Sequence, residues 1–274
     1  MLPRVDLIRS GDAEWLLLNN RDHISEFIRH NGFWGQAEAT ICSAFLAYSN
    51  EGSVVIDAGA NLGGFTVPIA AKLLQMGGRL YAFEPQRIVF QQLCANVFLN
   101  RLDNVFTHNV ALSNESGEIS VPELDFHQSM NAGGVSLNPE FRAELQAEAN
   151  QDGGLPNTSR SDGPSLSVPC RTIDSFGVFE RVAFMKVDVE GYELEVFQGA
   201  VETIKRNGFP PIIFEVWERS WYTEKAERTK QFLTDLGYTF IAFGREVLAQ
   251  HAAYPLRCVQ EQAEGGIRLS IEKT

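Results

Sequence analysis

A strand that leads directly into a glycine-rich turn is the feature that most limits what this chain can fold into. Residues 54–66 have the sequence V-V-I-D-A-G-A-N-L-G-G-F-T, in which a β-branched run ends at Asp57. A second short apolar run, residues 79–84, ends at Glu84. A buried strand, a glycine-rich turn, a helix and a second strand ending in an acid form a nucleotide pocket at the carboxyl edge of a parallel sheet. The sequence therefore predicts an α/β fold with a nucleotide site at that edge.

The spacing of the turn residues discriminates between nucleotides. Dinucleotide-binding turns follow G-x-G-x-x-G, in which the second glycine lets the backbone approach a pyrophosphate. Gly59 and Gly64 occupy the first and third positions, but Asn61 stands at the second. Glu84 suits a ribose, because a carboxylate accepts hydrogen bonds from both hydroxyls. The pattern favours S-adenosylmethionine, with Asp57 and the turn amides facing its aminocarboxypropyl end; the alternative is a strand-to-helix turn that binds nothing.

Composition excludes several classes of partner. The chain has 274 residues, with 23 Lys and Arg against 35 Asp and Glu. Because binding a nucleic-acid backbone needs a basic face, this balance argues against a nucleic-acid substrate. No run is long and apolar enough to cross a membrane, and charged residues interrupt the start before a signal-peptide core can form. The four cysteines lie far apart without a C-x-x-C motif, so we expect reduced thiols and a cytoplasmic protein.

Apolar periodicity predicts strands that alternate with helices. Strands are expected at residues 54–57, 79–84, 105–112, 182–188, 211–216 and 238–243. Helices are expected after the glycine-rich turn, with Pro68 in the first turn, and at about 89–97, 194–204 and 229–236. Alternation of this kind implies a parallel sheet with helices on both faces. The C-terminal residues 267–271 alternate like an edge strand.

The region before residue 51 is predicted to be a separate unit. Apolar residues recur at helical spacing within 24–28 and 41–48. We expect residues 1–50 to form an N-terminal helical cap over the cofactor edge, and residues 51–274 to form the main domain.

An insertion at about residues 113–170 interrupts the main domain. A short strand is expected at 117–121 and a short helix at 140–149. Because a long loop in a compact domain is usually functional or disordered, we predict a substrate-gating lid at 126–137 and a flexible linker at 151–165.

Acidic residues stand at or near the ends of four predicted strands: Asp57, Glu84, Asp188 and Glu215. Ligands of open α/β sheets bind outside the carboxyl ends of the strands. We therefore expect these acids to converge on one edge.

Five motifs occur in an order that resembles one known family. They are V-I-D-A-G-A-N-L-G-G-F-T at 55–66, F-E-P at 83–85, A-L-S at 111–113, R-T-I-D at 171–174 and K-V-D-V-E-G-Y-E at 186–193. Together they resemble the FkbM-type methyltransferases, which use S-adenosylmethionine, over about residues 54–216. The resemblance implies a class I methyltransferase (Rossmann-like) fold with seven strands, the last pair antiparallel.

The resemblance also implies an activity and a set of cofactor contacts. The activity is methyl transfer, usually to a hydroxyl of a sugar or secondary metabolite and in some members to an amide nitrogen. By motif position, Glu84 would hold the ribose, and Asn109 and Ala111 would lie near the adenine. The residues expected at the amino-acid end of the cofactor are Asp57, Gly59, Asn61, Gly63 and Thr66.

Methylation of an alcohol needs a group that takes the hydroxyl proton, because a neutral hydroxyl is a poor nucleophile. The candidates are Asp188, Glu190, Glu215 and His127. Asp188 is the first choice for an acid that faces the substrate or the cofactor, whereas Glu190 and Glu193 either act there or cap the next helix. Lys186 lies in phase with Asp188 and is predicted to pair with a carboxylate.

Several alternatives remain open at this point. A magnesium site on Asp188, Glu190 and Glu215 competes with the metal-free mechanism that we expect. Trp217, Trp221 and Tyr222 either wall an acceptor pocket or belong to the core. The expected partner is a small-molecule or glycan acceptor, and the competing functions are N-methylation, a non-catalytic cofactor-binding module and a nicotinamide dehydrogenase.

Overall fold

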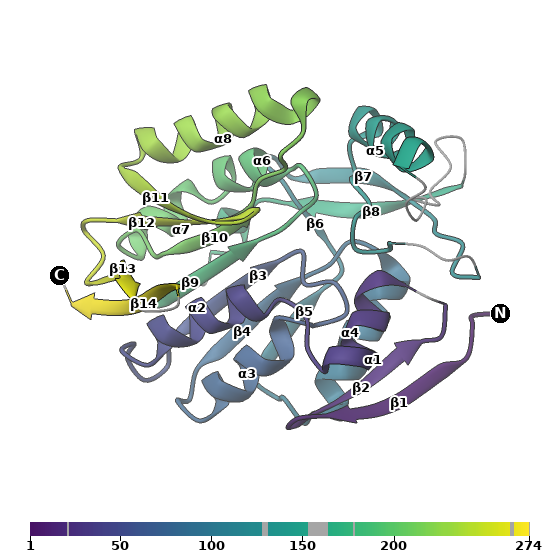
Figure 1. The fold of residues 1–274 in the computed structure, drawn as a ribbon, viewed down its shortest axis with the longest axis horizontal. Helices are drawn as coiled ribbons and strands as arrows, with labels where there is room; N and C mark the ends of the chain where they lie inside the picture. Colours follow the sequence, from purple (N-terminus) through teal and green to yellow (C-terminus); the bar gives the residue numbers. More distant parts are fainter. Residues whose placement is uncertain (21, 128–130, 153–163, 178, 264–265, 274) are drawn as a thin grey trace.

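Seven strands form the central sheet, in the order β11-β12-β10-β9-β3-β4-β5 (Figure 1). The computed structural model describes residues 1–20, 22–127, 131–152, 164–177, 179–263 and 266–273. The strands are β3 (Val54–Ala58), β4 (Arg79–Phe83), β5 (Val105–His108), β9 (Val182–Val187), β10 (Ile212–Glu215), β11 (Tyr238–Phe243) and β12 (Glu246–His251). The first five pair in parallel, and β12 pairs antiparallel with β10 and β11. The predicted seven-stranded, mostly parallel sheet with a final antiparallel pair is confirmed.

Helices cover both faces of this sheet. The first face packs against α2 (Gln36–Leu46), α3 (Thr66–Leu74) and α4 (Arg87–Leu99). The second packs against α6 (Glu193–Gln198), α7 (Val201–Arg206) and α8 (Thr223–Asp235). Along β3, Val55 packs with the first group and Ile56 with the second. Alternating apolar burial on both sides is what a central parallel strand requires.

The N-terminal region begins with a hairpin that the sequence did not predict. β1 (Val5–Ser10) pairs antiparallel with β2 (Ala13–Leu18), and the expected helices follow as α1 (His23–Asn31) and α2. Helix α4 and its C-cap residue supply hydrogen bonds along β2: Asn100, the C-cap, binds both backbone groups of Glu14 (2.9 and 2.7 Å). Asn96 Oδ1 accepts the N–H of Leu16 (2.7 Å), and Gln92 Nε2 donates to its carbonyl (2.8 Å). Side-chain amides thus take the place of a neighbouring strand.

The third predicted strand, 105–112, is too long. β5 ends at His108, and Ala111–Leu112 forms β6 in a separate sheet with β8 (Ser165–Arg171) and β7 (Gly117–Pro122). Asn109 lies at the break, where its Nδ2 donates to the carbonyls of Glu84 (2.8 Å) and Pro85 (3.0 Å). These bonds redirect the chain away from the central sheet.

The insertion contains a longer helix than expected, α5 (Pro139–Asp152). The predicted linker 151–165 overlaps the end of α5 and the start of β8, and its residues 153–163 lie outside the described part of the chain.

Three further elements differ from expectation. The predicted helix 194–204 divides into α6 and α7 at Gly199, where a Cβ would lie 2.1 Å from the carbonyl oxygen of Ser113. β12 was not predicted. β13 (Leu256–Ala263) was not predicted either; it pairs with β14 (Gly266–Lys273) in a two-stranded sheet, and the expected edge strand 267–271 lies within β14.

Short 3-10 turns at Ile173–Phe176 (η1) and Ser220–Tyr222 (η2) complete the described elements. A bilayer-spanning helix is not found among the described residues.

Candidate active site

A cavity of about 740 Å³ lies at the carboxyl ends of the parallel strands. Its inner wall consists of the turn after β3 and the residues that follow β4, β9 and β10. The outer wall comes from the α1–α2 connection, the insertion and the segment after β10. Its lining includes Gly59, Asn61, Glu84, Gln86, Ala111, Lys186, Asp188, Glu190, Glu215, Trp217 and Glu246.

The turn after β3 has a backbone conformation that explains its glycine. Gly59 has φ +80°, and a Cβ there would lie 1.7 Å from the carbonyl oxygen of Asp188. Only glycine lets the turn approach the end of β9 this closely. Asn61 has φ +50°, which asparagine tolerates better than most residues, and its Oδ1 accepts the N–H of Leu62 (2.7 Å).

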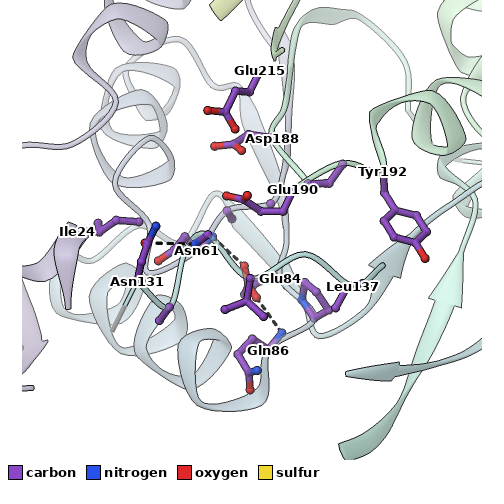
Figure 2. Close-up of a pocket in the computed structure, with 18 of the residues that line it drawn as sticks. Ile24, Asn61, Glu84, Gln86, Asn131, Leu137, Asp188, Glu190, Tyr192 and Glu215 are labelled. Atoms are coloured by element: carbon purple, nitrogen blue, oxygen red, sulfur yellow. Dashed lines mark hydrogen bonds between the residues drawn. The ribbon is translucent and has the colours of Figure 1, made fainter. Parts of the chain in front are cut away.

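Glu84 directs its carboxylate at the turn (Figure 2). Its Oε2 accepts the backbone N–H of Asn61 (3.0 Å), and its Oε1 accepts the N–H of Gln86 (2.8 Å). Burial raises the pKa of Glu84 to about 7, although both hydrogen bonds oppose the shift. A carboxylate has about four lone-pair sites, so each oxygen can still accept a ribose hydroxyl.

Asp57 and Thr66 lie beneath the cavity and do not line it. Asp57 is fully buried and accepts a hydrogen bond from Thr66 Oγ1 (2.6 Å). Asp57 and Lys186 are cross-strand partners in β3 and β9, and Lys186 Nζ lies 3.3 Å from Asp57 Oδ1. The predicted direct contact between Asp57 and the cofactor therefore gains no support from this placement.

Lys186 joins three groups at the floor of the cavity. Its Nζ donates to the carbonyl of Gly59 (2.8 Å) and lies 3.5 Å from Asp188 Oδ2, in addition to its ion pair with Asp57. Burial lowers the pKa of Lys186, but attraction to Asp57 and Asp188 outweighs it and raises the pKa above its ordinary value. The predicted pairing of Lys186 with a carboxylate is confirmed.

Three acids meet at the other side of the cavity, in the upper half of Figure 2. One carboxylate oxygen from each of Asp188, Glu190 and Glu215 lies within 4.8 Å of the others. Glu215 accepts a hydrogen bond from Trp217 Nε1 (2.8 Å) and pairs with Arg245 (3.3 Å). Carboxylates this close can share a proton or hold a cation.

Burial and mutual repulsion raise pKa values in this cluster. Burial, then Glu215 and Asp188, raises the pKa of Glu190 well above its ordinary value. Burial, followed by Asp188, raises the pKa of Glu215 to about 7 and that of Glu246 to about 8.

Glu246 escaped the sequence analysis because β12 was not predicted. A two-residue turn, Gly244–Arg245, separates the alternating apolar residues of β11 and β12. That hairpin signal could have located it.

Of the remaining predicted site residues, some line the cavity and others do not. Ala111 lines the cavity, whereas Gly63 does not, and Asn109 holds the chain after Glu84 as described above. His127 is exposed and outside the cavity, with its Nε2 2.5 Å from the carbonyl oxygen of Met1. This position does not support His127 as a general base.

The described part of the predicted lid, residues 131–137, passes over the cavity. Asp22 Oδ1 accepts the N–H of Ala132 (3.0 Å), and Ser136 Oγ donates to the carbonyl of Glu190 (2.5 Å). Residues 128–130 lie outside the described part of the chain, and gating by this segment stays a prediction.

The aromatic residues after β10 both line the cavity and form a core. Trp217 lines it, while Trp221 and Tyr222 pack with Trp217 and Phe141 of α5. Trp221 and Tyr222 therefore belong to this aromatic core, whereas a role of Trp217 in an acceptor pocket stays a prediction.

Comparison with known proteins assigns the chain. The Methyltransferase FkbM domain matches residues 57–240, well over half of the sequence. Methyltransferase sdnD of Sordaria araneosa is 29% identical over 201 residues, which are 67% of this chain and 73% of that protein. Methyltransferase 1 of Beauveria bassiana is 28% identical over 150 residues, 54% of this chain and 58% of that protein.

Among solved structures, Methyltransferase FkbM from Methylobacillus flagellatus superposes with a TM-score of 0.46 at 17% identity, covering 73% of this chain and 44% of that one. The family match spans the glycine-rich turn at 59–64, the strand ends at Glu84 and Asp188, and most of the central sheet. The chain therefore belongs to the FkbM methyltransferase family and is an S-adenosylmethionine-dependent enzyme.

Proposed function

We propose that this enzyme methylates a hydroxyl group of a small molecule or glycan, and that Glu190 takes the hydroxyl proton. The carrying observation is the meeting of Asp188, Glu190 and Glu215 at one side of the cavity, opposite the Glu84 side. The cavity volume of about 740 Å³ lies within the range of small-molecule sites.

The residues of the inner wall fit S-adenosylmethionine. Glu84 offers a carboxylate for two ribose hydroxyls, and Gly59 leaves the turn without a side chain. Ala111 on the wall leaves space for a flat base. On this basis the amino-acid end of S-adenosylmethionine lies over Gly59 and Asn61. The methyl group on its sulfur faces Asp188, Glu190 and Glu215.

The bound cofactor supplies an activated methyl group: the sulfur–methyl bond breaks, an oxygen–methyl bond forms, and the electron pair stays on sulfur. The cavity residues then have to align the acceptor oxygen and remove its proton. A base works best when its pKa lies near the operating pH, which favours an acid whose pKa is raised.

Different surroundings assign different roles to the three acids. Asp188 is paired with Lys186, so we assign it to the positive charge of the cofactor. Glu215 is held by Trp217 and Arg245, so we assign it to orienting the acceptor. Glu190 is surrounded mainly by other acids, which favours proton uptake and makes it the base.

Labelled methyl transfer tests this function. Purified protein and methyl-labelled S-adenosylmethionine are incubated with a panel of hexose glycosides, polyols, phenols and peptide amides, and mass spectrometry locates the new methyl group. We expect transfer to oxygen, and loss of at least about 100-fold in kcat for Glu190→Gln with unchanged affinity for S-adenosylhomocysteine. Glu115→Gln, on an exposed loop, is the control.

Two results would contradict the proposal. A methyl group found on nitrogen would move the enzyme to amide methylation. Full activity of Glu190→Gln would remove Glu190 from its role as base.

A further inference from the structure

The loop between β9 and α6 carries Glu190 in an unusual backbone conformation. Glu190 has φ +54° and Gly191 has φ +95°. Residues other than glycine rarely adopt this left-handed backbone conformation, and the conformation persists only where the surroundings enforce it. Contacts to the backbone on both sides of Glu190 must therefore hold the loop in this conformation.

The side chain of Glu193 makes those bonds. Its Oε1 accepts the backbone N–H of Val189 (3.2 Å) and that of Gly191 (3.1 Å), the residues on either side of Glu190. Its Oε2 accepts the hydroxyl of Tyr222 (2.9 Å), and its exposed fraction is 2%. Glu193 is the first residue of α6, and the two N–H groups that its Oε1 accepts, those of Val189 and Gly191, lie in the loop before the helix.

Two neighbours complete the frame. Ser136 of the lid segment donates to the carbonyl of Glu190 (2.5 Å). A Cβ on Gly191 would lie 2.8 Å from the ring of Phe141, so the loop is pressed against the aromatic group that contains Tyr222. The loop is thus fixed from the insertion, from α6 and from the segment before α8.

We propose that Glu193 is a positioning residue for Glu190: it binds both peptide N–H groups beside Glu190 and so keeps that carboxylate next to Asp188 and Glu215. The kinetic part of this proposal rests on the proposed function of Glu190 as base. Without the carboxylate of Glu193, Glu190 relaxes toward an ordinary backbone conformation and its side chain leaves the cluster.

Hydrogen exchange tests the structural part without an acceptor. In Glu193→Ala, the amides of Val189 and Gly191 should exchange at least about tenfold faster than in the wild type, measured by NMR. Glu193→Gln retains an oxygen for these amides and should exchange close to the wild-type rate. Glu195→Gln is the matched control, because it makes the same substitution in α6 at a residue that pairs with Lys225.

Kinetics tests the functional part, with the acceptor that the labelled-transfer panel returns. Glu193→Ala should lower kcat at least about tenfold while KM for S-adenosylmethionine changes less than about twofold, and Glu193→Gln should restore most of kcat. Tyr222→Phe leaves the two hydrogen bonds from the backbone amides to Glu193 in place and should give a smaller loss of kcat. This variant keeps the comparison available if Glu193→Ala does not fold.

Three outcomes decide the inference. Unchanged exchange in Glu193→Ala overturns it. A Glu193→Gln variant as impaired as Glu193→Ala, with KM raised in both, also overturns it because it indicates a general structural role. If the wild type methylates no acceptor, the proposed function fails, and hydrogen exchange alone decides whether Glu193 fixes the loop.

Discussion

The backbone N–H of Asn61 donates to the carboxylate of Glu84 across 23 residues of sequence, at 3.0 Å. The bond joins the turn after β3 to the residue that follows β4, so one carboxylate ties together two walls of the cavity where we propose that the cofactor binds. Replacing Glu84 by Gln puts an amide N–H₂ where one of two acceptor oxygens stood.

We expect Glu84→Gln to weaken binding of S-adenosylhomocysteine by about 10- to 100-fold, the usual effect of losing hydrogen bonds to a charged group. Isothermal titration calorimetry measures this, with Glu115→Gln as the control. Equal affinities for wild type and Glu84→Gln would place the ribose elsewhere.

Cofactor affinity should also depend on pH through Glu84. Its pKa is about 7 without ligand, and the ionised form is the better acceptor of ribose hydroxyls. Affinity for S-adenosylhomocysteine should therefore rise as pH increases through about 7, and this rise should be absent in Glu84→Gln. A pH-independent affinity in the wild type would contradict this assignment.

Stability should follow the opposite course. Glu84, Glu193, Glu215 and Glu246 ionise near 4.5 when unfolded, but burial raises their folded pKa values to about 7 or 8. The folded state holds their protons longer, so its stability is fully present below about 4.5 and falls as pH rises through 7 to 8. Thermal unfolding midpoints measured from about pH 5 to 8.5 should decrease, and less steeply in Glu246→Gln.

Lys186 should matter for folding as well as for the site. Removing it leaves Asp57, which is fully buried, without its cross-strand cation. We expect Lys186→Met to lower the free energy of unfolding by about 3–5 kcal/mol, measured by urea denaturation. Lys72→Met, on the exposed side of α3, should change little, and adding Asp57→Asn to Lys186→Met should recover part of the loss. No recovery would mean that the ion pair is not the cause.

Methyl transfer should continue in excess EDTA. If Glu190 accepts the proton directly, no cation has to occupy the space where Asp188, Glu190 and Glu215 meet. Loss of activity that MgCl₂ restores, together with heat on titrating MgCl₂ that disappears in Glu215→Gln, would instead make the three acids metal ligands.

The central fold could be predicted because its signals are local. Runs such as residues 54–56 are apolar throughout, glycines mark the turn, and acids mark the strand ends. From these features the sequence predicts that Glu84, Asp188 and Glu215 lie together, and all three line one cavity.

The direction of individual side chains could not be predicted. Asp57 stands at a strand end like Asp188. Its side chain, however, contacts Lys186 and Thr66 and lies beneath the cavity instead of lining it. Glu193 accepts a hydrogen bond from Tyr222, which is 29 residues away in sequence. Such tertiary pairs leave no periodic signal in the sequence. The sequence likewise shows that His127 has the chemistry of a general base, but not that it lies outside the cavity.

Three side-chain amides, two in α4 and one at its C-cap, have a consequence for the N-terminal hairpin. An unpaired strand edge is a template on which a second chain can add, and Gln92, Asn96 and Asn100 occupy that edge at Glu14 and Leu16. Asn96 also donates to the carbonyl of Leu62, next to Asn61 in the cofactor turn (2.8 Å). Helix α4 thus both covers the open edge of the hairpin and holds the glycine-rich turn of the cavity.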